Sequence, residues 1–223
     1  MSNSAIPVIA IDGPSASGKG TVAQLVAKKL GFHYLDSGAL YRIVAFAAHK
    51  HNIAWDQADA LGELAQKLSI EFDQDEIYLA GDRITEAVRS EQMSRGASEV
   101  AIHPPVRNAL LNLQRNFRQP PGLVGDGRDI GSVIFKDAQL KIFLTASAET
   151  RAERRYKQLM GKGLSANYEQ ILADLKNRDL RDSQRASAPL IQTADALLLD
   201  TTERTIEQAV QFVLDAYRKN KVQ

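Results

Sequence analysis

The sequence predicts an α/β fold in which helices cover both faces of a parallel sheet. Short apolar runs alternate with stretches of helical periodicity along most of the chain, and this alternation is typical of parallel sheets. The first apolar run leads directly into a glycine-rich loop, and the loop leads into a helical pattern. In the middle of the chain the alternation stops, and short strand-like pieces joined by turn residues predict a small antiparallel insertion.

The first strand is predicted at residues 8–11, which are apolar and mostly β-branched, as buried strands are. After Lys19 the apolar residues follow the helical period, and Gly31 supplies a stop. The predicted buried stripe of this helix consists of Val22, Leu25, Val26 and Leu30. Further strands are expected at residues 32–35, 123–125, 140–144 and 196–199, and a closing helix carries Ile206, Val210, Val213 and Tyr217.

The insertion is predicted as an antiparallel meander. Its strand-like pieces are residues 69–72, 77–80 and 83–84, with turns at 73–75 and 81–82. Helices are expected from Ser90 and after Pro105. Residues 156–167 are polar and contain Gly161-Lys162-Gly163, so we expect a mobile flap there between two helices.

The composition limits the classes of protein to which the chain can belong. Its 28 basic and 27 acidic residues leave a net charge of +1, whereas a protein that neutralises many nucleic-acid phosphates carries a basic excess. The absence of cysteine excludes disulfides, thiolate metal sites and a cysteine nucleophile. Residues 1–7 lack the features of a signal peptide, and no apolar run is long enough to span a bilayer. We therefore expect a cytoplasmic protein that binds neither nucleic acid nor membranes.

The glycine-rich loop is the strongest chemical signal in the sequence. It consists of Gly13, Pro14, Ser15, Ala16, Ser17, Gly18, Lys19, Gly20 and Thr21. Backbone N–H groups in such a loop converge on phosphate oxygens, and the following helix dipole adds to the attraction. Lys19 is expected to bridge the β- and γ-phosphates of a nucleotide and to stabilise the transferring charge. An ordinary glycine turn is the alternative, and the loop alone does not distinguish a kinase from a GTPase or a transporter motor.

The residue after the lysine departs from the usual pattern of such loops. A serine or threonine normally stands there and contacts Mg²⁺ through its hydroxyl, but here that position holds Gly20, and Thr21 comes next. We therefore expect no direct metal ligand from the protein. Mg²⁺ would be held by ATP and through water, with Thr21 and Asp126 as the candidate residues.

Residues 36–42 form the first candidate site for a second, phosphorylated substrate. They follow the second predicted strand, and the carboxyl ends of parallel strands line the ligand cleft of such sheets. Ser37, Tyr41 and Arg42 would then face the cleft. A capped helix that carries a surface arginine explains the same residues equally well.

Residues 125–129 form the second candidate. Asp126 stands where phosphate-loop proteins place the acid that orients Mg²⁺-bound water. Arg128 follows a glycine and is able to bind a phosphate with both arms of its guanidinium. The alternative is a tight turn, which Asp-Gly favours.

An arginine-rich stretch in the C-terminal half is the third candidate. Its residues Arg178, Arg181, Asp182 and Arg185 are predicted on one helical face. The alternative is a solvated face on which Arg178 and Asp182 form an i,i+4 ion pair. Further arginines precede the polar flap, at Arg151, Arg154 and Arg155. Arginines on a closing flap neutralise a transferring phosphoryl group, and closure excludes water.

Four stretches in this order resemble the cytidylate kinases of bacteria, which are nucleoside monophosphate kinases with a phosphate loop. They are residues 11–21, 35–42, 125–129 and 178–185, within a resemblance that covers about residues 7–200. The resemblance implies one kinase domain over residues 1–223, with about five parallel core strands. Its expected parts are a core (1–36, 105–150 and 186–223), a monophosphate-binding part (37–104) and a lid (151–185). The meander is similar to the insertion of these enzymes and argues against an adenylate kinase.

The resemblance also implies which residues bind CMP. They are Ser37, Tyr41, Arg42, Ser98, Arg107, Arg128, Asp129, Arg178, Asp182 and Arg185. Among them Ser98, Arg107 and Asp129 would read the edge of the cytosine, since another base would leave these groups unpaired. Arg178 and Asp182 would contact the sugar.

Other expected roles concern catalysis and ATP. The resemblance implies that Arg128 and Arg185, together with Arg42, hold the acceptor phosphate, and that Arg151 and Arg155 cover ATP. The expected catalytic residues are Lys19, Arg128, Arg155 and Arg185. The expected protein is a monomer that phosphorylates CMP and dCMP with ATP and Mg²⁺. The alternatives are a kinase of the same fold for AMP, UMP or shikimate, and a nucleotide switch that hydrolyses without an acceptor.

Overall fold

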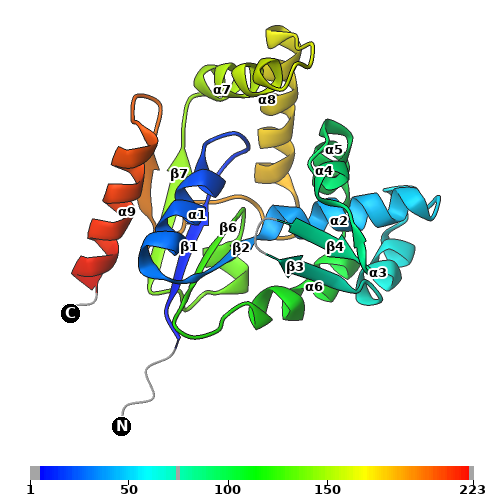
Figure 1. The fold of residues 1–223 in the computed structure, drawn as a ribbon, viewed down its shortest axis with the longest axis horizontal. Helices are drawn as coiled ribbons and strands as arrows, with labels where there is room; N and C mark the ends of the chain where they lie inside the picture. The colour runs from blue at the N-terminus through cyan, green and yellow to red at the C-terminus, as the bar shows by residue number, and fades with distance from the viewer. Residues whose placement is uncertain (1–5, 74–75, 221–223) are drawn as a thin grey trace. The chain divides into compact units, whose positions relative to one another are not determined.

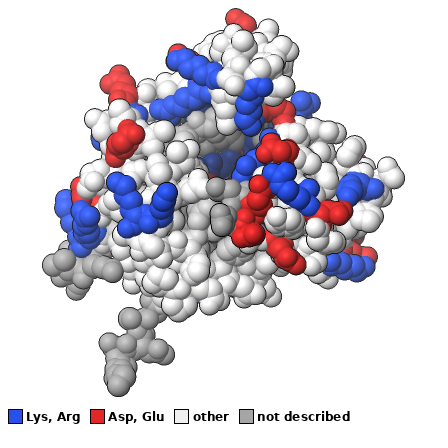
Figure 2. All heavy atoms as spheres, in the orientation of Figure 1, with Lys and Arg blue, Asp and Glu red and all other residues white. Residues whose placement is uncertain are grey.

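The structure, a computed structural model, describes residues 6–73 and 76–220. The chain forms two compact units, one of residues 1–35 and 117–223 and the other of residues 36–116. Among the described residues, no helix combines the length and the hydropathy that crossing a bilayer would need. Figure 2 shows basic and acidic side chains interspersed on the visible face, which fits the nearly balanced charge of the chain.

The first unit is built on a five-stranded sheet with the strand order β2-β6-β1-β7-β8 (Figure 1). Its elements are β1 (Val8–Asp12), α1 (Lys19–Leu30), β2 (His33–Asp36), β6 (Leu123–Gly127), η1 (Ile130–Ile134), β7 (Leu140–Thr145), α7 (Ala148–Gly161), α8 (Tyr168–Gln184), β8 (Leu197–Asp200) and α9 (Ile206–Asn220). Strand β1 pairs in parallel with β6 and β7, and β7 pairs in parallel with β8. The predicted parallel α/β fold is confirmed.

The core of the first unit explains its sequence pattern. All five residues of β1 are buried, so the strand is a continuous apolar run up to its last residue rather than an alternation. Helices α1 and α9 share one hydrophobic cluster with the sheet, in which Ile11, Val26 and Val213 are all fully buried. On the other side, the position of a Cβ at Gly131 in η1 lies 3.3 Å from the Cβ of Ala10.

The prediction that Leu25 is buried in this helix is wrong. Leu25 is 37% exposed, whereas Ala23 and Ala27 are buried beside Val22 and Val26. Because alanine side chains are short, the helix packs on the sheet through a face that includes both alanines, and this rotation turns Leu25 toward solvent.

Two further boundaries differ from the prediction. Strand β6 extends to Gly127, so Asp126 lies inside the strand and the alternative of a tight Asp-Gly turn is excluded. Helix α7 continues to Gly161, so the first half of the predicted flap is helical. The polar residues at 156–161 are the exposed side of that helix, and the i,i+4 pair of Glu153 and Lys157 supports it.

The second unit consists of helices around a small sheet. Its elements are α2 (Ser37–Lys50), α3 (Ala58–Gln66), β3 (Ile70–Asp73), β4 (Glu76–Leu79), β5 (Asp82–Arg83), α4 (Thr85–Val88), α5 (Glu91–Val100) and α6 (Pro104–Asn116). Strand β4 pairs antiparallel with β3 and with β5, which confirms the predicted meander. Two residues of the predicted turn at 73–75 lie outside the described residues.

Close packing between helices of this unit depends on glycine. A Cβ at Gly62 in α3 would lie 2.5 Å from the Cβ of Pro105 in α6. A Cβ at Gly96 in α5 would lie 2.6 Å from the ring of Trp55. Both distances are far below van der Waals contact, so a larger residue would separate α3 from α6 at Gly62 and would push α5 away from Trp55, in the turn before α3, at Gly96.

Candidate functional site

The phosphate loop lies between the end of β1 and the start of α1, as the sequence predicts. Gly13 packs so closely on β7 that a Cβ there would lie 1.9 Å from the carbonyl oxygen of Leu144. Gly18 precedes α1 with a φ of 91°, in the left-handed region that favours glycine. Ala16 adopts a φ of 58°, which costs a non-glycine residue free energy and is frequent at ligand-binding loops. The loop geometry therefore requires glycine at two positions and holds strain at a third.

Side chains of the loop also bind its own backbone. Ser17 Oγ donates to the carbonyl oxygen of Pro14 at 3.0 Å, and Lys19 Nζ donates to the same oxygen at 3.2 Å. The ammonium group of Lys19 thus lies over the loop, at the place from which it would reach the phosphates of a bound nucleotide.

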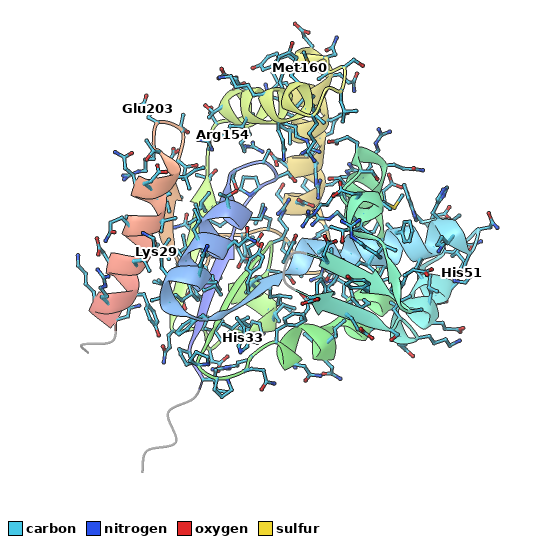
Figure 3. All side chains as sticks on the ribbon, viewed as in Figure 1. Lys29, His33, His51, Arg154, Met160 and Glu203 are labelled. Atoms are coloured by element: carbon cyan, nitrogen blue, oxygen red, sulfur yellow. The ribbon has the colours of Figure 1, made fainter. Side chains whose placement is uncertain are left out.

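Two arginines of α7 hold the loop from outside. Arg151 Nη1 donates to the carbonyl oxygen of Ser15, and Arg154 Nη1 donates to that of Ser17, both at 3.2 Å. Figure 3 labels Arg154 on α7 near the loop that precedes α1. Arg154 also donates to the carbonyl and hydroxyl oxygens of Thr201, after β8. These bonds tie the loop to α7 and to the end of the sheet.

Arg128 joins the phosphate loop to α8. Its Nη2 donates to Ser15 Oγ and its Nε donates to Asp182 Oδ2, both at 2.6 Å. The side chains of Arg128 and Asp182 are 14% and 6% exposed. Burial opposes the ionisation of Asp182, but the neighbouring arginines, Arg128 first, hold the pKa of its carboxyl below the ordinary value. The carboxyl group of Asp182 is therefore ionised at neutral pH.

Asp129 and Arg185 form a second buried pair in the same unit. Asp129 Oδ1 lies 3.6 Å from Arg185 Nη2, and the two side chains are 4% and 5% exposed. Arg185 is the C-terminal cap of α8, and its Nε donates to the carbonyl oxygen of Ala188. Arg181, predicted on the same face, is exposed because its direction on the helix lies about 60° from that of Arg178.

The arginines of the predicted lid have different surroundings. Arg151 is buried and forms a bidentate pair with Asp179 of α8, at 2.6 and 3.1 Å. Arg155 Nη1 donates to Gln158 Oε1 of its own helix, on an exposed side. Arg151, expected to contact ATP, thus lies close to the phosphate loop through its bond to the carbonyl oxygen of Ser15.

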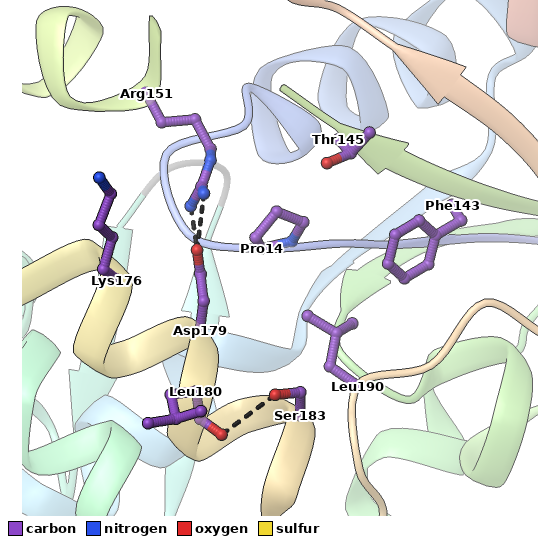
Figure 4. A pocket seen from close by; sticks show the side chains of 9 residues that line it. All are labelled: Pro14, Phe143, Thr145, Arg151, Lys176, Asp179, Leu180, Ser183 and Leu190. Atoms are coloured by element: carbon purple, nitrogen blue, oxygen red, sulfur yellow. Dashed lines mark hydrogen bonds and ion pairs between the residues drawn. The ribbon is translucent and has the colours of Figure 1, made fainter. Parts of the chain in front are cut away.

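An open pocket of about 440 Å³ lies between the phosphate loop, β7 and α8. Figure 4 shows Arg151 and Asp179 paired at one side of it, with Pro14, Phe143 and Leu190 around the rest. Of the charged groups in its wall, Arg151 and Asp179 neutralise each other, and Lys176 pairs with Glu149 of α7 outside the wall.

Gly20 faces a carboxylate on β6 and a phenol on β2. Tyr34 Oη donates to Asp126 Oδ1 at 2.6 Å. A Cβ at Gly20 would lie 3.6 Å from Tyr34 Oη and 3.7 and 3.8 Å from the two carboxylate oxygens of Asp126. Carboxylate oxygens bind Mg²⁺ or its waters, so these residues fit a water-held Mg²⁺ ion where other phosphate loops offer a hydroxyl. Thr21 is exposed in the first turn of α1.

A buried carboxylate at the end of β1, Asp12, was not among the predicted site residues. Its two oxygens accept the backbone N–H groups of Ile130 and Gly131, each at 2.8 Å. Burial raises the pKa of Asp12 to about 7, although the two amides act in the opposite direction. A charged residue that ends an otherwise apolar strand is a signal that the sequence did offer.

In the second unit the start of α2 is capped by Asp36. Asp36 Oδ1 accepts the N–H of Ala39 at 2.9 Å, and Oδ2 accepts from Arg42 Nη2 at 2.6 Å. Ser37 is buried, and its Oγ donates to Gln114 Oε1 at 2.6 Å. The capped helix that the sequence allowed is therefore present, and it already engages one arm of Arg42.

The remaining predicted residues of this unit are buried polar groups. Arg107 lies 5.7 Å from the centre of the Tyr41 ring and donates to the carbonyl oxygen of Ala101. Ser98 is 4% exposed. Among the described residues, Ser98 Oγ and Arg42 Nε are buried without a hydrogen-bond partner. Such atoms are rare in folded proteins, and these two belong to residues that are expected from the sequence at the site of the second substrate.

Four residues that organise the site escaped prediction. They are Asp12, Tyr34, Arg154 and Asp179, of which Arg154 was noted as one of several arginines near the lid but given no role. Tyr34 left no signal, because a tyrosine in a half-buried strand is ordinary. Asp179 belongs to a helix rich in charges, and only the fold shows which of these face the core.

A family model described as cytidylate kinase matches residues 9–219 of the chain. A protein named cytidylate kinase from Polynucleobacter asymbioticus is 60% identical over 215 residues, which cover 96% of this chain and 98% of the relative. Proteins with the same name from Chromobacterium violaceum and Cupriavidus necator are each 56% identical. The first match covers 97% of both chains, and the second covers 94% of this chain and 95% of the relative.

Proposed function

Because this chain belongs to the cytidylate kinase family, its activity is the phosphorylation of cytidylate, and we propose that it transfers the γ-phosphoryl group of ATP to CMP or dCMP, forming ADP and CDP or dCDP. The transfer is in line and passes through no covalent enzyme intermediate. The acceptor is a phosphate oxygen that is already ionised at neutral pH, so the reaction needs no general base.

The donor is bound by the phosphate loop. Its backbone N–H groups and the start of α1 hold the β- and γ-phosphates of ATP, and Lys19 follows the charge that moves to the bridging oxygen. The bonds from Arg151 and Arg154 to the loop carbonyls keep these groups in place before ATP arrives. Preformed donors of this kind stabilise a transition state without reorganising during the reaction.

The acceptor phosphate is bound by arginines. Arg128 and Arg185 act with Arg42, and each guanidinium is able to bind two phosphate oxygens at once. In the present structure these arginines bind Asp182, Asp129 and Asp36. The carboxylates hold the arginines in position and reduce the cost of burying their charge. The N–H groups of these arginines other than those that face the carboxylates would bind the phosphate oxygens.

The base and the sugar are recognised by the buried polar groups. Ser98 and Arg107 together with Asp129 bind the cytosine edge, and Arg178 and Asp182 bind the ribose. The buried Oγ of Ser98 lacks a hydrogen-bond partner among the described residues, and a cytosine would supply one. A base with the opposite pattern of donors and acceptors would leave these groups unpaired, which disfavours its binding.

Mg²⁺ accompanies ATP and neutralises its phosphate charge. Asp126 and Thr21 would hold it through its water ligands, and Tyr34 donates a hydrogen bond that fixes the carboxylate of Asp126. Arg155, with Arg151, belongs to a lid that excludes water, so that the phosphoryl group reaches the acceptor instead of being hydrolysed. We further propose that the enzyme acts as a cytoplasmic monomer, which sedimentation or light scattering of the purified protein tests.

The observation that best supports these assignments is the position of Arg128. Its guanidinium bonds at the same time to Ser15 of the phosphate loop and to Asp182 of the arginine-rich helix. Because Arg128 contacts both the phosphate loop and the helix that carries the arginines proposed for the acceptor, its charge is suited to stabilise a phosphoryl group during transfer.

A coupled ADP-release assay with several acceptors tests the proposed reaction. With ATP and Mg²⁺, we expect CMP and dCMP to exceed AMP by about 10²-fold or more in kcat/KM. UMP and shikimate complete the panel, and a reaction without acceptor measures hydrolysis. Strong turnover with AMP and little with CMP would refute the assignment of the acceptor, and hydrolysis that no acceptor accelerates would indicate a nucleotide switch instead of a kinase.

A further inference from the structure

The carboxylate of Asp12 connects two functional segments of the first unit. Asp12 is the last residue of β1 and directly precedes Gly13 of the phosphate loop. Its side chain is buried, and Oδ1 and Oδ2 accept the N–H groups of Ile130 and Gly131, each at 2.8 Å. These two amides open η1, to which the N-terminal cap residue Asp129 gives no capping hydrogen bond from its side chain. Asp12 thus caps η1 from a neighbouring strand.

The segment that Asp12 caps carries the residues of the acceptor site. Arg128 and Asp129 lie directly before Ile130. On the other side of this pair of residues, the N–H of Gly13 donates to the carbonyl oxygen of Gly127 at 3.3 Å. Arg128 and Asp129 are therefore held between two attachments, and both attachments lead to the junction of β1 and the phosphate loop.

The surroundings of Asp12 bring the ionisation of its carboxyl group into the neutral pH range. Burial raises its pKa to about 7, the charge of Asp129 acts in the same direction, and the two amides and the charge of Lys19 oppose it. On β7, the stem of Lys141 packs against Gly131 while its ammonium group binds Asp195. The carboxylate of Asp126, on β6, accepts from Tyr34.

We propose that Asp12 is a positioning residue, whose ionised carboxylate holds Arg128 and Asp129 in the place that acceptor binding requires. This inference rests on the proposed function of those two residues. Protonation converts one oxygen into a hydroxyl whose hydrogen competes with an incoming N–H, so one of the two amides loses its acceptor. The segment before η1 then loosens, and kcat/KM for CMP falls, with a smaller effect on the binding of ATP.

Ionisation has the opposite effect on folding. The folded pKa, about 7, lies above the unfolded value of 3.8, so the folded state binds the proton more tightly. The stabilisation from this group is complete below the unfolded pKa and is lost as the pH rises through the folded pKa. Between these values the proton stabilises the fold while it reduces acceptor binding. A residue that only supported the structure would move stability and activity in the same direction.

The test compares wild type with Asp12→Asn, which has the same shape and cannot ionise. We expect the ratio of wild-type to variant kcat/KM for CMP to rise about tenfold as the pH increases from about 5.5 to 8.5, with a midpoint near the pKa of Asp12. Taking the ratio removes the titration of the CMP phosphate. Relative to wild type, Asp12→Asn should have a larger increase in KM for CMP than in KM for ATP. Over the same rise in pH, the melting temperature of the variant should increase relative to that of wild type.

The matched control is Asp137→Asn, a surface carboxylate that pairs with Arg118. Its ratio to wild type should stay flat with pH. A flat ratio for Asp12→Asn as well, or equal increases in both KM values, would overturn the proposal. A wild-type enzyme that does not use CMP at any pH would refute the proposed function instead, and the two failures are therefore distinguishable.

A second measurement requires no variant and covers the case in which Asp12→Asn does not fold. Amide hydrogen exchange of wild type should give Ile130 and Gly131 protection factors that fall as the pH decreases through about 7, because protonation removes one acceptor. The amides of Val124 and Gly125 in β6 serve as internal references, and their protection should not change over this range. Constant protection of Ile130 and Gly131 would contradict the proposal.

Discussion

The two units of the chain hold their candidate site residues in different ways. In the first unit, arginines are paired with carboxylates at short distance: Arg128 with Asp182 and Arg151 with Asp179, each at 2.6 Å. In the second unit, the buried atoms Ser98 Oγ and Arg42 Nε have no hydrogen-bond partner among the described residues. Ser132 Oγ of the first unit is such an atom as well, so the difference concerns the candidate site residues named here: the first unit fixes Arg128 and Arg151 by ion pairs, whereas the second leaves hydrogen-bonding capacity at Ser98 and Arg42.

This difference follows from the strength of the groups involved. An ionised arginine that is buried without a counter-charge costs far more than a buried hydroxyl without a hydrogen bond, so arginines of both units, Arg42 with Asp36 included, are paired within the protein. On the proposed function, the hydroxyl of Ser98 would receive its partner from the substrate, and the second unit would then contribute selectivity.

The largest expected effect concerns the charge of the first unit. Lys19→Ala should lower kcat by about 10³-fold, because the lysine stabilises charge that develops only in the transition state. The melting temperature should change little, since Lys19 lies partly exposed over the loop. Lys28→Ala, in the exposed last turn of α1, is the control and should retain wild-type rates. Near-normal turnover of Lys19→Ala would contradict the assignment of the donor site.

The next effect separates acceptor from donor within the first unit. Arg185→Ala should reduce kcat/KM for CMP by about 10²-fold, because it removes a bidentate phosphate contact and leaves Asp129 buried without its ion pair. KM for ATP should change much less. Arg185→Lys retains the charge but not the planar fork, and is expected to recover only part of the loss. Equal losses for CMP and ATP would show that Arg185 does not belong to the acceptor site.

The sequence predicts some features of the first unit and misses others. The phosphate loop and the parallel sheet follow from local rules, since an apolar strand, a glycine-rich loop and a helical stripe are adjacent in the chain. The extent of the buried stripe of α1 does not follow from these rules, because Leu25 is exposed while two alanines are buried. Only the fold decides which residues of a helix touch the sheet, and small residues permit a contact that hydrophobicity alone does not reveal.

Pairings between distant residues were beyond sequence reasoning. The sequence offered a pair of Asp182 with Arg178, four residues earlier, as one alternative, but it gave no sign of the short ion pair that joins Asp182 to Arg128, 54 positions away. Likewise Asp12 meets amides 118 and 119 positions later. Neither spacing carries a periodic signal, because Asp12 meets η1 at the carboxyl end of the parallel sheet and Asp182 reaches Arg128 from helix α8, and only the fold brings these segments together.

A pair of serine variants tests the comparison within the second unit. Ser98→Ala should raise KM for CMP about tenfold and leave the free energy of unfolding unchanged, because the hydroxyl has no partner to lose in the folded protein. Ser37→Ala should instead destabilise the protein by about 1 kcal/mol, because it removes the 2.6 Å bond to buried Gln114. Urea unfolding and steady-state kinetics give both values. A loss of stability in Ser98→Ala without any change in KM would invalidate the comparison.

The smallest expected effect concerns Tyr34, whose hydroxyl donates to Asp126. Tyr34→Phe should raise the Mg²⁺ concentration for half-maximal activity about threefold, because Asp126 loses the bond that orients it toward the place beside Gly20, while kcat at saturating Mg²⁺ stays the same. Binding of Mn²⁺ to the enzyme–ADP complex, followed by electron paramagnetic resonance, measures the same change without turnover. Tyr168→Phe in α8 is the control. Unchanged metal binding in Tyr34→Phe would mean that the Tyr34–Asp126 bond serves the fold of β2 and β6 and not the metal.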